Sequence, residues 1–457
     1  MKGKHALVLG ASMAGLLTAR VLADYFERVT LVERDQLAAE TGSHIGVPQG
    51  RHAHAVLARG LSSMEQLFPG LTAGLVAGGA LPTDIARDVS WYQFGGYKVR
   101  ADVGLPGIVL TRPFLEAHIR ERLLGRPNIV LIQGADVQGL LTNAAHDRVL
   151  GVTLQRRGSE PEPCQADLTV DATGRAAQSP KWLEALGYAR PAESTVKVNV
   201  GYASRFYRRL PGEPKDAVAY MVSDTPPHGK RSGAFLAVEG QRWMVTLAGF
   251  VGDHPPLDEA GFLEFARSLP TPEIYQRLQS AQALTEIVAH KYPSDLRRHY
   301  EKMARFPEGY LVLGDALCSF NPVYGQGMTV AALEAEALGD CLRRQLGQDL
   351  TGLPGRFFES VTPLIDVPWR MATGEDWRYP EVEGQRPRGT ALINRYAVQI
   401  HRAARTDAVV CRAFFNVANL NQPPASLFHP ALMARVLLAN RPGRHAPTPA
   451  RAAAPMA

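Results

Sequence analysis

Residues 5–33, HALVLGASMAGLLTARVLADYFERVTLVE, contain the stretch that decides the fold, the glycine turn GASMAG at 10–15. The apolar run at 5–9 has the length of a strand. Ala14, Leu17 and Val21 then recur at helical spacing, and the β-branched run at 29–32 predicts a second strand. A glycine turn between a strand and a helix, with an acidic residue at the end of the next strand, is typical of a dinucleotide site.

Each position of this turn has a physical role. Gly10 permits the tight turn, Gly15 lets the helix pack closely on the strand, and the N–H groups at the helix start can hold a pyrophosphate. Glu33, about 20 residues further on, can accept hydrogen bonds from ribose hydroxyls. Ser12 stands where the pattern usually has its middle glycine, and its small side chain can donate its own hydroxyl to the phosphates.

Two other interpretations of this stretch stay open. The sequence GASMA at 10–14 approximates the nucleophile turn of α/β-hydrolases, which also lies between a strand and a helix. That turn expects several strands before it and Asp and His partners after it, whereas Ser12 follows the first strand. The other alternative is an ordinary turn without a ligand. The strand, the helix and Glu33 together favour the dinucleotide site.

A second strand–turn–helix unit comes late in the chain. The run YLVL at 310–313 predicts a buried strand, 314–327 is a glycine-rich loop, and a helix is expected from there to about residue 346. Asp315 can accept hydrogen bonds from a polyol chain. Gly325 and Gly327 expose N–H groups before a helix start, whose partial positive charge would stabilise an anionic reduced flavin. Two such units far apart predict one nucleotide-binding domain interrupted by an insertion.

The insertion and the C-terminal part have patterns of their own. Residues 197–206 and 232–249 predict antiparallel sheet with a turn at 239–240, and 258–269 predicts a short helix on that sheet. Aromatic residues at 91–97 predict sheet packing rather than a substrate cage. The pattern is helical again at 394–405 and 425–439. The tail from 441 lacks apolar periodicity and is expected to be disordered.

The composition limits the class of protein. With 46% apolar and 21% charged residues over 457 positions, the chain is globular in character and neither disordered nor fibrous. The net charge of +6 is spread thinly with both signs interspersed, so nucleic-acid binding is not expected. The four cysteines lie far apart, which predicts neither disulfides nor zinc and fits a reducing, cytoplasmic compartment. No apolar run reaches the roughly 18 residues of a membrane span, so we expect a soluble protein.

Together with the segment DATGR at 171–175, the two glycine-rich units resemble the three fingerprints of class A FAD-dependent monooxygenases, whose fold is like that of p-hydroxybenzoate hydroxylase. The resemblance spans residues 1–345. Ala172 stands where this family usually has glycine after the aspartate. The segment GVPQGRHAH at 46–54 is similar to that of bacterial polyketide-tailoring epoxidases and hydroxylases, among them the polyene epoxidases of polyether antibiotic pathways.

The resemblance implies a fold and a set of cofactor contacts. The expected fold class is α/β, a Rossmann-like FAD-binding domain interrupted by an antiparallel β-sheet substrate domain, with C-terminal helices. By the same resemblance Arg112 contacts FAD and Val137 contacts the adenine through its backbone. His44, His52 and His54 line or flank the flavin pocket rather than hold a metal, since no carboxylate or cysteine accompanies them at ligand spacing. The residues expected to bind FAD are Gly10, Ser12, Met13, Ala14, Gly15, Glu33, Arg34, Gln49, Arg51, Arg112, Val137, Asp171, Gly174, Gly314, Asp315, Pro322, Gly325, Gln326, Gly327 and Met328.

The expected domain division follows the same two units. The FAD-binding domain takes residues 1–75, 111–185 and 291–346. The substrate domain takes strands at 76–110 and the β-sheet at 186–290. A helical region covers 347–440, and a disordered tail covers 441–457.

The resemblance also implies a reaction. FAD, reduced by NAD(P)H directly or through a separate flavin reductase, would react with O2 to a C4a-hydroperoxyflavin that passes one oxygen atom to an apolar secondary metabolite. Hydroxylation of a phenol gains from a base, whereas epoxidation needs only proximity to the electrophilic oxygen. Because no base is evident in the insertion, epoxidation of an alkene or polyene polyketide is the first expectation and hydroxylation of an aromatic substrate is the alternative. No catalytic side chain is assigned.

Other flavoprotein classes rank lower. A flavin-dependent halogenase should contain a W-x-W-x-I-P motif and its lysine, which VPWR at 367–370 does not supply. A prenyl reductase would saturate its substrate rather than oxygenate it, so O2 consumption distinguishes the two. A non-enzymatic flavoprotein would bind FAD without substrate-dependent oxidation of NAD(P)H.

Overall fold

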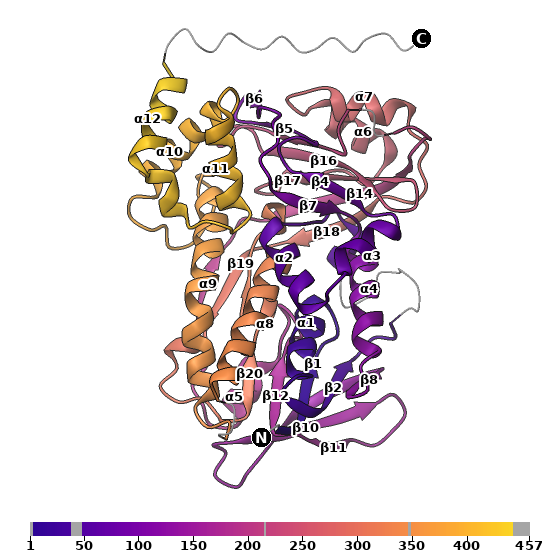
Figure 1. Ribbon diagram of the computed structural model, residues 1–457, viewed down its shortest axis with the longest axis vertical. Coiled ribbons are helices and arrows are strands. Elements are labelled where there is room, and N and C mark those ends of the chain that lie inside the picture. Colours follow the sequence, from indigo (N-terminus) through magenta and orange to yellow (C-terminus); the bar gives the residue numbers. More distant parts are fainter. Residues whose placement is uncertain (1–2, 38–47, 214–215, 346–348, 442–457) are drawn as a thin grey trace.

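The computed structural model describes residues 3–37, 48–213, 216–345 and 349–441. A five-stranded parallel sheet lies in its lower half, in the strand order β20-β12-β1-β2-β8 (Figure 1). The first strand, β1, pairs with β2 on one side and with β12 on the other. The five strands are β1 (Gly3–Leu9), β2 (Phe26–Glu33), β8 (Ile129–Gln133), β12 (Leu168–Asp171) and β20 (Tyr310–Val312).

Alternate residues of β1 serve two different cores, because successive side chains of a strand point to opposite faces. Ala6 and Val8 pack among helices, whereas Leu7 and Leu9 pack against a three-stranded antiparallel sheet. The helices of the first core are α1 (Met13–Leu22), α2 (Ala58–Leu67), α3 (Leu71–Ala77), α4 (Arg112–Leu124), α5 (Ser179–Ala185), α8 (Gly327–Arg344) and α9 (Leu353–Asp376). The strands of the second are β9 (Ala135–Thr142), β10 (Val149–Arg156) and β11 (Glu162–Gln165).

A seven-stranded sheet in the order β18-β14-β17-β16-β15-β5-β6 forms the other half of the molecule (Figure 1). It is antiparallel except for the parallel pair β15 and β5. Ala203 and Val245 pack against α6 (Glu259–Arg267) and α7 (Glu273–Ser280), so the alternate residues Ser204 and Thr246 face the nucleotide-binding half. The strands are β5 (Val89–Gln93), β6 (Gly96–Tyr97), β14 (Val200–Arg208), β15 (Ala219–Ser223), β16 (Arg231–Val238), β17 (Arg242–Gly249) and β18 (Val288–Tyr292).

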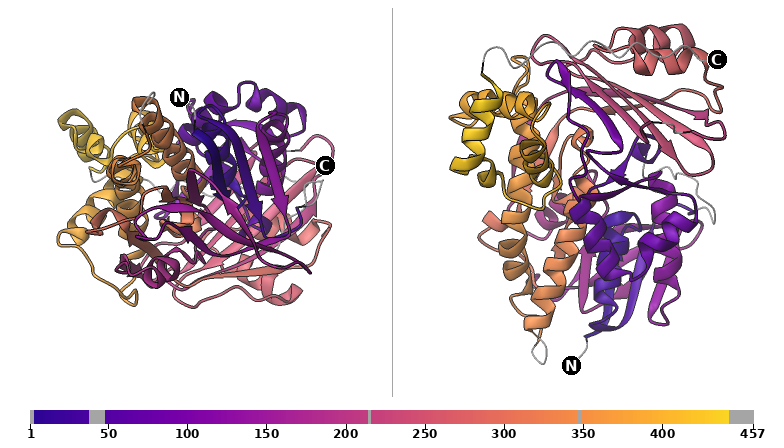
Figure 2. Two further views of the ribbon diagram at one scale, coloured as in Figure 1. Left: turned by 90° about the horizontal axis from the view of Figure 1, so that it is seen from below. Right: turned by 45° about the horizontal axis from the view of Figure 1, so that its top comes forward.

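The C-terminal helices pack beside the seven-stranded sheet, as the two further views of Figure 2 also show. Phe415 and Val436 share a core with Val103 and Leu105, and Trp91 of β5 packs against it. These helices are α10 (Thr390–Ala403), α11 (Ala408–Ala418) and α12 (Pro430–Ala439). Two small sheets complete the fold, one of β3 (Ala55–Val56), β4 (Leu81–Asp84) and β7 (Pro106–Val109), the other of β13 (Ala192–Val196), β19 (Asp295–His299) and β21 (Cys318–Ser319).

The predicted fold class is confirmed, and so are the strands and helices expected at both glycine-rich units. The 24-residue helix α9 lies within the region 347–440 that was expected to be helical, but no helical pattern was assigned to its own residues, which include Pro363 and Pro368. It packs on α8, and Phe357 and Val361 bury its apolar face in the main core. The expected disordered tail, apart from Arg441, lies outside the described residues. None of the helices in the described ranges is long and apolar enough to cross a membrane.

Candidate flavin and substrate site

The turn after β1 is so tight that only glycine fits at two positions. Gly10 has a φ of 94°, and a Cβ on it would lie 2.7 Å from the carbonyl oxygen of Ala172. A Cβ on Gly15 would lie 1.9 Å from the carbonyl oxygen of Gly10. The turn is therefore pressed against the end of β12, and α1 begins directly above it at Met13. This is the geometry that brings a phosphate close to a helix start.

Glu33 ends β2 beside this turn. Its buried carboxylate accepts hydrogen bonds from the backbone N–H groups of Ala11 at 2.9 Å and Asp35 at 3.0 Å. The carboxylate thus fastens the turn and retains lone pairs at the edge where a ribose would lie. The neighbouring Arg34 is exposed, and its Nε lies 3.9 Å from Oδ1 of Asp35.

An ion pair from α4 covers the start of α1. Glu116 Oε1 accepts the hydroxyl of Ser12 at 2.6 Å and the N–H of Met13 at 3.3 Å. Arg112 donates to Glu116 at 2.9 Å and to Ser12 Oγ at 2.8 Å. The Ser12 hydroxyl therefore donates to Glu116 in this structure, rather than pointing freely to a phosphate position. The guanidinium of Arg112 therefore lies beside Ser12, the residue directly before α1.

The late glycine loop lies against this first turn. Gly314 has a φ of 64°, and a Cβ on it would lie 2.8 Å from Cβ of Ala14. Glu334 of α8 holds Gly314 in place by accepting its N–H at 2.6 Å. Burial raises the pKa of Glu334 to about 8, so this carboxyl keeps its proton at neutral pH. The two distant glycine units thus pack directly against each other.

Asp315 follows Gly314 and carries the open acceptor of the site. Among the described groups, none donates a hydrogen bond to its half-buried carboxylate. Burial raises the pKa of Asp315, while the charges of Arg112 and Arg175 act in the opposite direction. A carboxylate that is partly desolvated and without a donor can accept hydroxyls from a polyol chain.

The start of α8 is open at its glycines. No described atom lies within 4 Å of an added Cβ on Gly325 or Gly327, so a flat ring can approach the backbone here. Gln326 is buried, and its Oε1 has no hydrogen-bond partner among the described groups. Pro322 is exposed in the preceding turn, and Met328 is buried in the main core.

Three of the remaining expected residues lie in different surroundings. Asp171 is fully buried, and its carboxylate accepts from Ser179 and from the N–H and hydroxyl of Thr173. Its hydrogen bonds therefore order the loop after β12. Gly174, with a φ of 81°, has no described atom within 4 Å of an added Cβ. Val137 lies on β9 and packs against the core that contains Leu9.

The segment before β3 carries the last expected residues. Gln49 and Arg51 belong to the short helix η1 (Pro48–Arg51); the side chain of Gln49 lies outside the described part, and Arg51 is exposed. His44 also lies outside the described residues. The Nδ1–H of His54 donates to the backbone carbonyl oxygen of His52 at 2.9 Å, and burial together with the charge of Arg112 lowers the pKa of His54 to about 4.

Asn321 joins the late loop to the seven-stranded sheet. Its Oδ1 accepts the hydroxyl of Tyr202 on β14 at 3.0 Å, and its Nδ2 donates to Asp376 at the end of α9 at 3.0 Å. The N–H of Asn321 donates to Asp295 at 2.6 Å. Both aspartates are buried, and burial next to Asp295 raises the pKa of Asp376 well above its ordinary value. The two carboxyls therefore hold a proton beneath the loop that contains Gly325.

His52 reaches the same sheet from the nucleotide-binding half. Its Nδ1 lies 2.7 Å from Ser204 Oγ on β14, and Ser204 Oγ lies 2.5 Å from Thr246 Oγ1 on β17. The ring is 5% exposed, and its Nε2 has no hydrogen-bond partner in the described structure. Tyr202 and Ser204 lie on one face of β14, so His52 is next to the contact between the sheet and Asn321.

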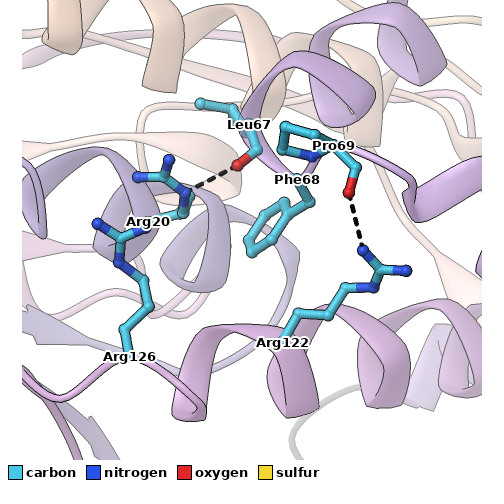
Figure 3. Close-up of a pocket in the computed structure, with 6 residues that line it drawn as sticks. All are labelled: Arg20, Leu67, Phe68, Pro69, Arg122 and Arg126. Carbon is cyan, nitrogen blue, oxygen red and sulfur yellow. Dashed lines mark hydrogen bonds between the residues drawn. The ribbon is translucent and has the colours of Figure 1, made fainter.

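A surface pocket at the other end of α1 does not belong to this site (Figure 3). Arg20 donates to the carbonyl oxygen of Leu67 at 2.7 Å, and Arg122 donates to that of Pro69 at 3.1 Å. Asp24 pairs with Arg20 and with Arg126. The arginines therefore fasten the end of α2 to α1 and α4. The pocket is lined by Arg20, Leu67, Phe68, Pro69, Arg122 and Arg126.

Sequence reasoning did not assign several residues of this arrangement. Glu116 had a local signal, because it follows Arg112 by one helical turn and can pair with it. Asn321, Asp295 and Asp376 had none, since they come from three separate segments. The hydrogen bond from His52 to Ser204 also joins residues that are 152 positions apart.

Comparisons with known proteins agree with the fold. No family model matches the chain. Protein Rv3254 of Mycobacterium tuberculosis is 35% identical over 430 residues, which cover 90% of this chain and 88% of that protein. PqsL of Pseudomonas aeruginosa, a probable FAD-dependent monooxygenase, has a TM-score of 0.59 at 16% identity over 82% of this chain and 98% of its own. The flavin-dependent brominase Bmp2 has a TM-score of 0.64 at 14% identity over 93% of this chain and 97% of its own. The chain therefore has the fold shared by FAD-dependent monooxygenases and related flavoproteins.

Proposed function

The chain belongs to the family of Protein Rv3254 of Mycobacterium tuberculosis, and we propose that it is an FAD-dependent monooxygenase. The observation that carries this proposal is the contact between the two glycine units, in which Gly314 lies against Ala14. Next to this contact, Glu33 accepts from Ala11, Arg112 donates to Ser12, and the charge of Arg112 acts on Asp315. A dinucleotide with a ribityl chain needs acceptors and cations in this order.

The described residues fit FAD. Glu33 would accept the adenosine ribose hydroxyls, Arg112 and the start of α1 would bind the pyrophosphate, and Asp315 would accept hydroxyls of the ribityl chain. The open backbone at Gly325 and Gly327 would face the pyrimidine edge of the flavin ring, at the positive end of α8. We retain the remaining expected contacts, apart from that of the Asp171 carboxylate, which accepts from Thr173 and Ser179, and the domain division stated above, as part of the proposal.

FAD bound at this position would supply hydride acceptance from NAD(P)H and the activation of O2. The overall reaction balances as substrate, O2, NAD(P)H and one proton giving the monooxygenated substrate, water and NAD(P)+. The two electrons that reduce the second oxygen atom to water come from NAD(P)H, directly or through a separate reductase. The chain's own residues would position the substrate beside the seven-stranded sheet, on the face of β14 that carries Ser204, and would exclude water there.

Two oxygenations fit this arrangement. Epoxidation of an alkene or polyene polyketide is the first candidate, because this reaction requires the substrate to be close to the flavin and does not require a titrating group. Hydroxylation of an aromatic or polyketide substrate is the second candidate, and a specific observation favours it. His52 brings a nitrogen without a partner to the sheet, which sequence reasoning did not find. A halogenase is less favoured because residues 367–370 lack the expected tryptophan motif.

The test begins with the purified protein. We expect a yellow protein with one FAD per chain, and NAD(P)H oxidation that accelerates when a substrate is added. Mass spectrometry of products formed under isotope-labelled O2 should show the gain of one labelled oxygen atom. Bromide- or chloride-dependent products would indicate a halogenase, and products that gain hydrogen without oxygen would indicate a reductase. Either outcome would overturn the monooxygenase assignment.

A further inference from the structure

His52 has the features of a ligand-binding group and not of a core histidine. A buried imidazole normally satisfies both ring nitrogens, yet only Nδ1 of His52 has a partner among the described residues. Leaving a buried donor or acceptor unpaired is costly. The cost is understandable if Nε2 meets a bound molecule during function.

The hydrogen-bond chain behind His52 favours one tautomer of the ring. Thr246 Oγ1 accepts the N–H of Ala53 at 2.9 Å, and Ser204 is the acceptor available for its hydroxyl hydrogen among the described groups. When Thr246 donates to Ser204 and Ser204 donates to Nδ1 of His52, every hydroxyl hydrogen of the chain is used. The opposite direction, from Nδ1 through Ser204 to Thr246, fits the same distances but leaves the hydroxyl hydrogen of Thr246 without an acceptor. We therefore assign Nδ1 as the acceptor and place the proton of the neutral ring on Nε2.

The surroundings keep the ring neutral and favour an oxygen ligand. Burial lowers the pKa of His52 to about 3, and the neighbouring His290, His54 and Arg51 act in the same direction. With the proton on Nε2, this nitrogen is a neutral donor at physiological pH, and Arg51 is the permanently charged group among these three neighbours. A carbonyl oxygen or a phenolate or enolate oxygen matches both properties. A hydrocarbon chain matches neither.

The position of His52 agrees with a substrate contact. It touches β14 at Ser204, two residues from Tyr202, whose hydroxyl binds Asn321 before the open glycines of α8. The next histidine along the chain, His54, lies in the field of Arg112 at the start of α1. His52 thus lies between the sheet and the proposed flavin position. The ring centroids of Tyr202 and His290 lie 5.9 and 5.6 Å from that of His52, so its neighbours here are aromatic.

We propose that His52 is a substrate-binding residue, which donates its Nε2–H to a phenolic, enolic or carbonyl oxygen of an aromatic polyketide-like substrate. This inference rests on the proposed monooxygenase function and narrows its substrate class. Ser204 and Thr246 are positioning residues, because they act only by holding the tautomer and the orientation of the ring. The oxygen held by His52 fixes which edge of the substrate faces the flavin, and a phenolate so held is an electron-rich target for oxygenation.

The first test reads the tautomer without any substrate. Nitrogen–proton correlation spectra of holoenzyme labelled at histidine should contain a ring with its proton on Nε2 that is missing in His52→Leu. In Ser204→Ala this signal should change, because Nδ1 no longer accepts a hydrogen bond from the Ser204 hydroxyl. A His52 ring with its proton on Nδ1 would overturn the proposal.

The second test uses matched probes, phenol with toluene and naphthol with methylnaphthalene, in calorimetric titrations of the holoenzyme. We expect each hydroxylated probe to bind at least tenfold more tightly than its partner, about 1.4 kcal/mol for one buried hydrogen bond. This preference should disappear in His52→Leu and persist in His52→Gln, whose amide keeps a donor at a similar distance from the backbone. His228→Leu is the control and should keep the preference, because this exposed histidine lies outside the proposed site.

Two results would overturn the proposal: no preference for the hydroxylated member of either pair, including the case in which neither member binds, or a preference unchanged in His52→Leu. Failure of the proposed monooxygenase function would give a different experimental result. It would appear as absent FAD or absent NAD(P)H oxidation in the unmodified protein, whatever the calorimetry and the tautomer show.

Discussion

Gly314 lies directly against Ala14, so the late glycine loop and the first turn of α1 leave no room for a side chain between them. The two residues come from opposite ends of the nucleotide-binding part. Their contact places Asp315 beside the ion pair that covers the start of α1. The following predictions test what each part of this arrangement does.

Replacing Gly314 with alanine should disturb both the fold and the flavin. The added Cβ would lie 2.8 Å from Cβ of Ala14, which costs about 1–3 kcal/mol as overpacking, and the positive φ costs about 1 kcal/mol more. Urea unfolding and the ratio of flavin to protein absorbance measure the two effects. Gly325→Ala is the matched control, because it has a similar φ of 68° but open space around the added Cβ. Equal destabilisation in both variants would contradict the close contact.

Asp315 and Asp171 should behave differently when replaced with alanine. Asp315→Ala should weaken FAD binding by about 1–3 kcal/mol, because one buried hydrogen bond to the cofactor is lost. Its unfolding free energy without FAD should change little, since no described group donates to that carboxylate. Asp171→Ala should instead lower the stability of the apoprotein by about 1–3 kcal/mol, because Thr173 and Ser179 lose their acceptor. The reverse pattern would exclude Asp315 as the ribityl acceptor.

Glu33→Ala should also weaken FAD binding, by about 1–3 kcal/mol for the lost hydrogen bond to the ribose. Because Glu33 fastens Ala11 and Asp35, part of the loss will come from the turn itself. Glu33→Gln separates the two contributions, since the amide oxygen can still accept one backbone N–H. Flavin content that is unchanged in the alanine variant would contradict the assignment.

Arg112 and Glu116 should be separable by a double-mutant cycle. Arg112→Met alone removes the guanidinium that donates to the buried carboxylate of Glu116, with an expected cost of about 3–5 kcal/mol in stability. The pair Arg112→Met with Glu116→Gln removes both charges and should recover most of that stability. FAD affinity should stay low in the double variant, because the pyrophosphate still lacks its cation. Recovery of FAD binding together with stability would mean that Arg112 serves only Glu116.

Stability should depend on pH through Glu334. The pKa of this carboxyl is raised from its ordinary 4.5 to about 8 by burial, so the folded state holds a proton that the unfolded state releases. The contribution of this protonated carboxyl to the free energy of unfolding is therefore full below pH 4.5, falls as the pH rises and is lost above about pH 8. Glu334→Gln keeps the acceptor for Gly314 and should remove this fall, so its advantage over the unmodified protein should grow between these pH values. If the free energies of unfolding of Glu334→Gln and of the unmodified protein change in parallel with pH, Glu334 is not protonated in the folded state.

The parts of the site that the sequence predicts are those that lie close together along the chain. The spacing of Gly10, Gly15 and Glu33 reflects a strand, a turn and a helix in direct succession, so local geometry determines their roles. The same holds for Gly314 and Gly325. The resemblance adds Arg112, whose partner Glu116 lies one turn further along the helix.

The parts that the sequence does not predict depend on tertiary contacts. His52 approaches Ser204 only because the seven-stranded sheet lies over the segment before β3, and no periodicity reports that contact. Asp295 and Asp376 meet under Asn321 for the same reason. Helix α9 lies in a region expected to be helical, but two prolines interrupt its own pattern, and burial of its apolar face against α8 outweighs their cost.

Titration of the flavin-free protein with FAD, followed by flavin fluorescence, tests the central claim most directly, that two distant glycine units bind one cofactor. We predict saturable binding of one FAD per chain, much weaker binding of riboflavin, which cannot reach both units, and loss of FAD binding in both Gly10→Val and Gly314→Val. A protein that binds no FAD, or that binds it equally well when either glycine is replaced, would contradict the account.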